Sequence, residues 1–280
     1  HVMQLKGDDF HFAFDLAASQ RAISRASAGF PMEGTAHITS LLPHVHGQVR
    51  DNFAFSTNIA YRFLYGEKFD NIFPDEASYT QFEGKLQNKT AIDAYLKFKL
   101  PWFELELGQD NLHWGPGYHG ALLVSENPIS MDMIKLKAAY KHITFSAFTA
   151  ILEDRNPEIN TKYISGHRIE GYFWNRFGLG LSEIVVYGNR FEPGYLNPVT
   201  LYLIKEVNIE RGDSRALGTG DNVFASIDGR LRLTDNLEFY GELMVDDGNP
   251  AVEFHNWDTK FGVLGGVYVT DPLGISDTDL

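Results

Sequence analysis

The chain has 280 residues, with 24 Lys and Arg against 37 Asp and Glu, a formal net charge of −13 and no cysteine. The acidic balance argues against a nucleic-acid partner, which requires clustered Lys and Arg, and the lack of cysteine excludes a disulfide framework, a thiol nucleophile and a Cys-based zinc site. No run of about 18 apolar residues occurs, which excludes a transmembrane helix but leaves a membrane β-barrel open, because barrel strands face lipid only at every second residue.

Alternation of apolar and polar residues predicts strands along most of the chain. The clearest strand runs over residues 53–65, where one face carries Phe53, Phe55, Thr57, Ile59, Tyr61, Phe63 and Tyr65. So many aromatic residues on one face fit a strand turned toward lipid, with tyrosine near the interface. The same alternation predicts further strands at about 9–18, 34–50, 92–100, 103–108, 134–140, 143–147, 162–173, 179–187, 223–233, 237–245 and 260–269.

Short and long connections between these strands alternate. Those near residues 51, 101, 141, 175 and 235 are a few residues long, whereas those at about 19–33, 66–86, 110–130, 153–161, 188–221 and 246–259 are long, polar and rich in Gly, Pro and Asp. This order predicts an all-β fold, a transmembrane antiparallel up-and-down β-barrel of about 12 strands with short periplasmic turns and long extracellular loops. We expect residues 1–280 to form a single outer-membrane barrel domain, or a section of a larger barrel.

Two local features depart from this regularity. Glu183 falls in phase with Leu179 and Leu181 on an otherwise apolar face, which indicates a β-bulge. Asn197-Pro198, followed by apolar residues up to Ile204, predicts the start of a short helix inside the longest connection.

A Gly- and Pro-rich stretch at residues 107–128 interrupts the strands. Its residues 115–120 formally match G-x-G-x-x-G, but no helix is expected at Gly120, so we reject a dinucleotide site. The glycines instead predict tight turns that present five side chains together. These are Asp110, His113, Trp114, Tyr118 and His119. Aromatic rings beside polar groups are typical of sugar binding; the alternative is a rigid loop that plugs the lumen and fills space.

Other polar clusters carry weaker signals. His44 and His46 share a strand face, with His11 or His37 as neighbours, but no third metal ligand is specified, and we favour the simpler explanation that they are polar residues facing the lumen. Glu104 and Glu106 share another face. They could form the carboxylate pair of a glycoside hydrolase, but ion pairs with Lys and Arg on neighbouring strands are the simpler interpretation. Ser165 and His167 share a face but lack an evident carboxylate partner. We therefore predict no catalytic residues, no metal site and no cofactor.

Several motifs together resemble one family. They are the run from Leu107 to Asn127 with its Trp114-Gly115-Pro116-Gly117 element, then residues 166–170, 178–183 and 195–198. These residues resemble the Wzi-type capsule assembly proteins of the bacterial outer membrane, over roughly residues 100 to 250. The resemblance implies an outer-membrane barrel of a Gram-negative bacterium that acts as a lectin for capsular polysaccharide.

The resemblance and the loop chemistry together give a functional expectation. We expect an outer-membrane barrel that binds or anchors capsular or surface polysaccharide without catalysis, with lipid, polysaccharide and envelope proteins as its partners. The predicted ligand-binding residues are Asp110, His113, Trp114, Tyr118, His119 and Arg168. Two alternatives are a pore for small solutes and a structural component of an envelope complex.

Overall fold

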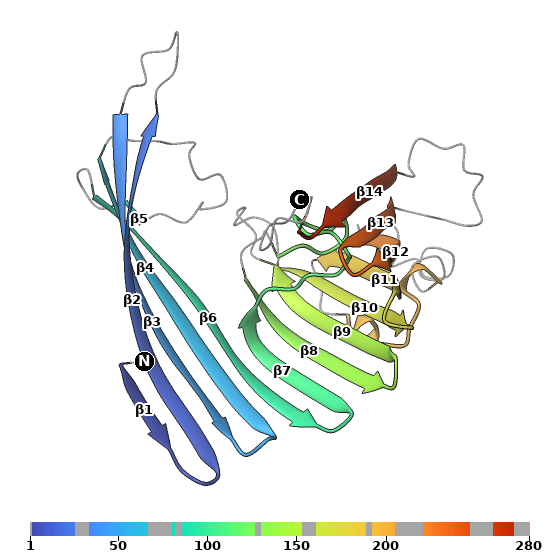
Figure 1. Cartoon of the computed structure of the whole chain (residues 1–280), viewed down its shortest axis with the longest axis horizontal. Helices are drawn as coiled ribbons and strands as arrows, with labels where there is room; N and C mark the ends of the chain where they lie inside the picture. The colour runs from blue at the N-terminus through green and yellow to red at the C-terminus, as the bar shows by residue number, and fades with distance from the viewer. Residues whose placement is uncertain are drawn as a thin grey trace. The chain divides into compact units, whose positions relative to one another are not determined.

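The structure, a computed structural model, describes residues 2–25, 34–66, 80–81, 86–126, 130–152, 161–188, 192–204, 221–246 and 260–271. These residues form antiparallel strands, one 3-10 helix and a helical turn at residues 202–204 (Figure 1). No helix among them is long and apolar enough to cross a membrane. The chain divides into two compact units, His1–Lys99 with Gly108–Asp110, and Leu100–Leu107 with Asn111–Leu280.

The first unit consists of strands that pair with their neighbours in chain order. They are β1 (Met3–Lys6), β2 (Phe10–Arg25), β3 (Gly34–Val49), β4 (Phe53–Gly66) and β6 (Leu86–Leu100), with the short β5 (Thr80–Gln81) paired to β6. The strands predicted at 34–50 and 53–65 are confirmed. Strand β2 continues well beyond the predicted end at residue 18, and β1 and β5 were not predicted, because two to four residues are too few to show alternation.

The two faces of this unit differ in chemistry. Phe53 pairs with Phe98 across β4 and β6, and Phe55 pairs with Leu96, so aromatic and aliphatic side chains share one face. Phe53, Leu96 and Phe98 are exposed, as expected for a face turned to lipid. The opposite face carries the polar residues, because side chains alternate along a strand.

The second unit is a longer antiparallel series. It contains β7 (Phe103–Asp110), β8 (Met131–Tyr140), β9 (Ile143–Leu152), β10 (Lys162–Phe173), β11 (Phe177–Gly188), β12 (Asn222–Thr234), β13 (Leu237–Asp246) and β14 (Lys260–Val269), with the 3-10 helix η1 (Pro193–Tyr195) between β11 and β12. All the predicted strands of this region are present, and the short turns near residues 101, 141, 175 and 235 are confirmed. Most of the predicted long connections lie outside the described residues.

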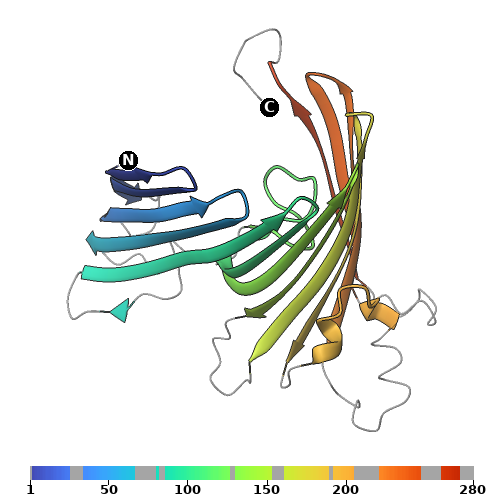
Figure 2. The ribbon, with the colours of Figure 1, turned by 90° about the horizontal axis from the view of Figure 1, so that it is seen from below.

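Two folded connections of this unit pack against its sheet. Residues 111–126, which we call the inner segment, lie against the concave side of the curved strands (Figure 2, green). The strand face that they cover carries Arg168, Asp228 and Glu242 and is called the inner face. The opposite, outer face exposes Leu179, Leu181 and Ile227. Residues 192–204, the outer segment, contain η1 and a helical turn at 202–204, which lies within the stretch predicted to start a helix.

The predicted bulge at Glu183 is wrong. Strand β11 pairs with both β10 and β12 without a shift in register, and Glu183 lies opposite His167 on one side and Ala225 on the other. Glu183 therefore does share the outer face with Leu179 and Leu181. The carboxylate is tolerated there because the outer segment covers it, as described below.

Candidate functional site

The inner segment is anchored on the sheet by Trp114. The backbone N–H of Trp114 donates to the carbonyl oxygen of Val124 over 2.9 Å, and this bond holds the two ends of the inner segment together. The indole is only 5% exposed and meets the ring of Phe148 edge-on at 5.1 Å between centroids. It belongs to a buried cluster of Leu112, Trp114, Val124, Met133, Phe148, Ala150, Ile164 and Ile184.

Gly166 of β10 makes room for that indole. A Cβ at this position would lie 2.6 Å from the Phe148 ring and 3.0 Å from the Trp114 ring. Since both rings are buried, neither has space to withdraw. A glycine is therefore needed on the sheet for the segment to dock, a role that the sequence motif did not indicate.

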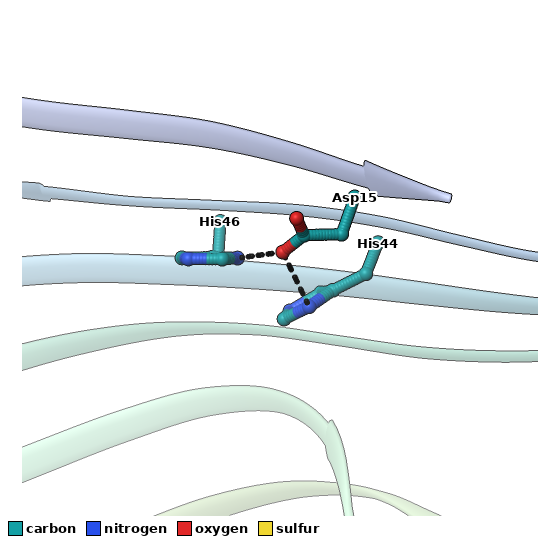
Figure 3. A group of neighbouring side chains, drawn as sticks. All are labelled: Asp15, His44 and His46. Carbon is teal, nitrogen blue, oxygen red and sulfur yellow. Dashed lines mark ion pairs between the residues drawn. The ribbon is translucent and has the colours of Figure 1, made fainter. Parts of the chain in front are cut away.

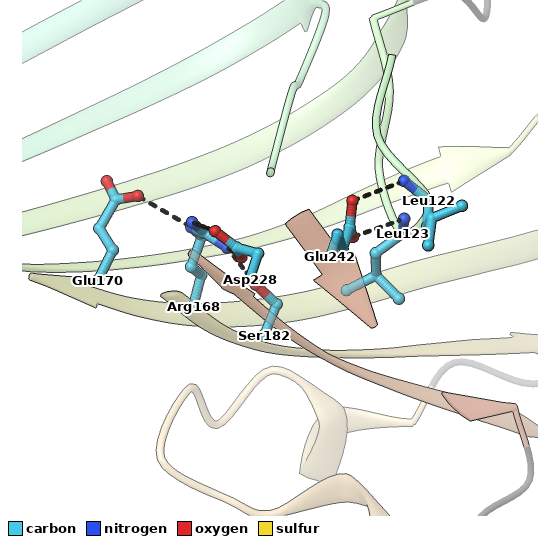
Figure 4. A network of polar contacts seen from close by, with 7 residues as sticks. All are labelled: Leu122, Leu123, Arg168, Glu170, Ser182, Asp228 and Glu242. Atoms are coloured by element: carbon cyan, nitrogen blue, oxygen red, sulfur yellow. Dashed lines mark hydrogen bonds and ion pairs between the residues drawn. The ribbon is translucent and has the colours of Figure 1, made fainter. Parts of the chain in front are cut away.

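A carboxylate of the sheet holds the other arm of the inner segment. Glu242 of β13 is 3% exposed and accepts hydrogen bonds from two consecutive backbone amides, Leu122 N–H at 2.9 Å and Leu123 N–H at 3.3 Å (Figure 4). Hydrogen bonds to an ionised group are about twice as strong as neutral ones. Gly115 passes over this carboxylate with φ 142°, and a Cβ there would lie 2.9 Å from Glu242 Oε2.

The glycines of the G-x-G-x-x-G match therefore have conformational roles. Gly115 and Gly120 have positive φ angles, of 142° and 144°. A Cβ on Gly117 would clash with the carbonyl oxygen of Gly120. No helix begins at Gly120, in agreement with the rejection of a dinucleotide site.

Tyr118 is the exposed aromatic residue of the inner segment. Its ring, 45% exposed, stacks on Tyr268 at 4.1 Å and meets Tyr240 edge-on at 5.5 Å. Its hydroxyl donates to Glu238 Oε1 over 3.2 Å. Partial burial raises the pKa of the Tyr118 hydroxyl, and the Glu238 carboxylate raises it further, so the phenol stays protonated as a donor. The ring is thus held in one orientation while the residue stays exposed.

Arg168 of β10 lies in a closed network on the inner face. Its guanidinium makes a two-pronged contact with the Asp228 carboxylate, in which Nη2 lies 3.0 Å from Oδ1 and Nη1 contacts Oδ2 (Figure 4). Nη1 also donates to Ser182 over 2.8 Å, and Nε donates to Glu170 over 2.9 Å. Lys135 and Glu106 form a similar pair at 2.7 Å on the same unit. The predicted ladders of carboxylates with basic residues are therefore confirmed at these two places.

The structure places the six predicted ligand-binding residues in different surroundings. Tyr118 and His119 are exposed on the inner segment, His113 is half-buried and Trp114 is buried in the cluster. Arg168 is buried beside Asp228, and Asp110 is the last residue of β7, whose end at Gly108–Asp110 belongs to the first unit. The structure brings residues that the sequence did not single out next to two of these six: Tyr240, Tyr268 and Glu238 lie at Tyr118, and Phe148 lies at Trp114. Polysaccharide binding by the six residues stays a prediction.

A second carboxylate holds the outer segment on the outer face. Glu183 accepts two consecutive amide hydrogen bonds, from Tyr202 N–H at 2.8 Å and Leu203 N–H at 2.7 Å, and lies 3.1 Å from His167 Nε2. His167 thus has a carboxylate partner that the sequence did not reveal. The Tyr202 hydroxyl donates to the carbonyl oxygen of Tyr195 over 3.1 Å, and burial raises its pKa.

Aromatic packing completes this contact. Tyr195 and Tyr202 are buried against the strands in a cluster of Val185, Tyr187, Tyr195, Tyr202 and Val223. Ser165 lies beneath it, 2.9 Å from Thr149 Oγ1 and 3.3 Å from the Tyr187 hydroxyl. Tyr195 starts the motif at residues 195–198, but no sequence signal indicated that its ring or that of Tyr202 would be buried.

Comparison with solved structures gives weak likenesses to outer-membrane proteins. A FadL homologue of Pseudomonas aeruginosa matches with 9% identity and a TM-score of 0.38, over 86% of this chain and 67% of its own. OmpT, an outer membrane protein of Vibrio cholerae, matches in a form lacking loop L8 with 10% identity and a TM-score of 0.33, over 93% of this chain and 99% of its own. No curated protein matches the chain.

Comparison with protein-family models identifies the family of this chain. The family model for the capsule assembly protein Wzi matches residues 22–280, which is most of the chain. The match confirms the resemblance found in the Trp114-Gly115-Pro116-Gly117 element, the outer-membrane β-barrel fold and the location in the bacterial outer membrane. The chain belongs to the Wzi capsule assembly family and has an outer-membrane role in capsule assembly.

Proposed function

We propose that the protein anchors capsular or surface polysaccharide at the outer membrane as a non-catalytic, lectin-like barrel. The observation that carries this proposal is the exposed Tyr118 ring, fixed by Tyr268 on one side and by Glu238 at its hydroxyl. His119 is exposed beside it. Aromatic edges and faces pack against the CH groups of sugar rings, while carboxylates and imidazoles bond the hydroxyls.

The rigidity of the inner segment supports binding at this place. Trp114 in its buried cluster and Glu242 with its two amide bonds fix the backbone on either side of Tyr118. A ring that is already ordered loses little entropy when a ligand binds. In this proposal Trp114 and Arg168 position the binding surface, while Tyr118 and His119 contact the polysaccharide.

The state of the polar groups supports binding without bond cleavage. Glycoside hydrolysis needs two carboxyl groups that can reach the substrate. Glu242 is occupied by two backbone amides and Asp228 by Arg168. The candidate nucleophile Ser165 is 0% exposed and lies among other hydroxyl groups.

The proposal is tested by measuring the affinity of the whole chain, purified in detergent micelles, for the capsular polysaccharide of the encoding bacterium. We expect Tyr118→Ala to weaken binding about tenfold, equivalent to about 1.4 kcal/mol. The matched control is Tyr140→Ala, which removes another exposed tyrosine at a tight turn of the same unit. Equal affinities for both variants would overturn the assignment of the surface.

Two further readouts separate the alternatives. The polysaccharide is sized before and after incubation with the protein, and shortened chains would contradict a non-catalytic role. The protein is also inserted into planar bilayers, where steady large single-channel currents would favour the solute pore over the anchor.

A further inference from the structure

The polar face of the first unit brings together three metal-ligating side chains. Asp15 of β2 pairs with His44 of β3, and Ala13 pairs with His46, so the carboxylate and both imidazoles lie on the same face. The sequence identifies the two histidines but not the carboxylate, which is 29 residues before His44 in the chain (44 − 15). The register between β2 and β3 supplies the missing third group.

The donor atoms converge (Figure 3). Asp15 Oδ2 lies 3.8 Å from His46 Nδ1 and 4.0 Å from His44 Nδ1. One donor atom from each residue can be chosen so that all three lie within 4.8 Å of one another. Ligands of a tetrahedral zinc ion are about 2.0–2.2 Å from the metal and hence about 3.3–3.5 Å apart. Small side-chain rotations close the remaining gap.

The surroundings suit an exchangeable ion. The side chains of Asp15, His44 and His46 are 29%, 33% and 28% exposed, so an ion can enter and keep water as a further ligand. Ser56 Oγ of β4 lies 3.0 Å from His44 Nε2 and orients that ring with Nδ1 toward Asp15. Second-shell hydrogen bonds of this kind commonly fix metal-ligating histidines.

A fourth imidazole lies nearby on the same face. The ring of His11 is 6.3 Å from that of His46 between centroids. His37, the other neighbour considered from the sequence, is an odd number of residues from His44 on β3 and stacks on Tyr65 at 5.0 Å, on the opposite face.

We propose that Asp15, His44 and His46 form a binding site for a divalent transition-metal ion of the zinc class, which joins β2 to β3. Two imidazole nitrogens and one carboxylate oxygen favour zinc and nickel over magnesium and calcium, which prefer oxygen ligands. The site lies wholly in the first unit and shares no residue with the proposed polysaccharide surface. A negative result for one proposal therefore leaves the other unaffected.

The test measures zinc binding to the whole chain in detergent. The protein is purified without a polyhistidine tag, stripped with EDTA, dialysed against micromolar zinc chloride and analysed for bound metal and protein. We expect one zinc ion per chain, a dissociation constant weakened at least tenfold by His46→Gln or Asp15→Asn, and no displacement by millimolar magnesium.

The matched control is His37→Gln, which removes an imidazole from the opposite face of the same strand and should leave the affinity unchanged. Cobalt(II) gives a second readout, because coordination by these ligands produces visible absorption that His46→Gln should abolish. Retained resistance to unfolding in detergent shows that each variant is folded. Absence of zinc binding by the folded parent chain, or equal loss in His37→Gln and His46→Gln, would overturn the site.

Discussion

The two units of the chain treat the polar faces of their strands differently. In the first unit Asp15, His44 and His46 are half-exposed, and Ser56 beside them is buried. In the second unit the inner segment covers the equivalent positions, and Arg168, Asp228 and Glu242 are buried in contacts within the protein. Polar residues at alternate strand positions therefore have two roles in this fold. In the first unit the three ionisable groups are accessible to solvent, and in the second unit such residues hold folded connections against the sheet.

Within the second unit the same device occurs on both faces of the sheet. Glu242 on the inner face and Glu183 on the outer face each accept two consecutive backbone amide hydrogen bonds from a connecting segment. In both cases an aromatic residue of the segment is buried close by, Trp114 on one face and Tyr202 on the other. A carboxylate on a strand thus docks a loop without requiring any particular side chain from it, because every non-proline residue has an amide.

Removing the buried indole is the strongest test of the inner segment as a structural anchor. We expect Trp114→Ala to lower the free energy of unfolding by about 3–5 kcal/mol, because it leaves a cavity beside Phe148 and removes a large buried ring. The measurement is urea-induced unfolding of the protein in detergent or lipid, followed by tryptophan fluorescence. Trp174→Ala is the control, since Trp174 is 84% exposed at a turn and should cost under about 0.5 kcal/mol. Equal stability of the two variants would contradict the anchoring role.

The contributions of Glu242 and Glu183 can be tested one at a time by substitutions that remove the charge. Glu242→Gln and Glu183→Gln each replace one acceptor oxygen by an NH₂ group that faces an amide N–H, and should destabilise the contact by about 1.5–3 kcal/mol. Limited proteolysis with mass spectrometry should then show faster cleavage within residues 111–126 for the first variant and within 192–204 for the second. Glu170→Gln, at a more exposed partner of Arg168, serves as control. Cleavage of both segments in either variant would show that they do not dock independently.

We expect a smaller loss of stability from substitution of Gly166, the glycine that leaves space for the Trp114 indole. Gly166→Ala places a methyl group 2.6 Å from the Phe148 ring, and overpacking of this kind costs about 1–3 kcal/mol. Gly265→Ala in β14 is the matched control, because the nearest atom to its Cβ is 3.7 Å away. Unfolding midpoints in urea compare the two. A stability loss in Gly265→Ala equal to that in Gly166→Ala would show that the exchange of glycine for alanine in a strand, and not contact with the rings, is responsible.

The sequence predicted the regular part of this architecture well because alternation reflects burial directly. Phe53 to Tyr65 mark an apolar face, and the structure exposes Phe53, Phe63 and Tyr65 on it. The Glu183 interpretation failed for a physical reason: its partners are backbone amides at Tyr202 and Leu203, which any residue would provide. The carboxylate looked misplaced because the covering segment leaves no pattern in the sequence.

The site residues were harder to predict for a related reason. Trp114 was chosen as an aromatic residue in a polar loop, but the space for its ring is created by Gly166 of a distant strand. Asp15 joins His44 only through the β2–β3 register, and a slip of one residue would put it on the opposite face. Such groupings depend on pairing between strands, which one sequence does not specify.

The smallest expected change in the free energy of unfolding compares the polar faces of the two units directly. Asp15→Asn removes a half-exposed carboxylate from the first unit, and in metal-free protein it should change the free energy of unfolding by less than about 1 kcal/mol, as is typical of exposed ion pairs. Asp228→Asn, by contrast, removes the buried carboxylate partner of Arg168, leaves it only the exposed Glu170, and should cost several times more. Both are measured by urea unfolding after EDTA treatment. If Asp15→Asn were as costly as Asp228→Asn, the polar face of the first unit would be a structural element like that of the second, and its availability for a metal ion would have to be rejected.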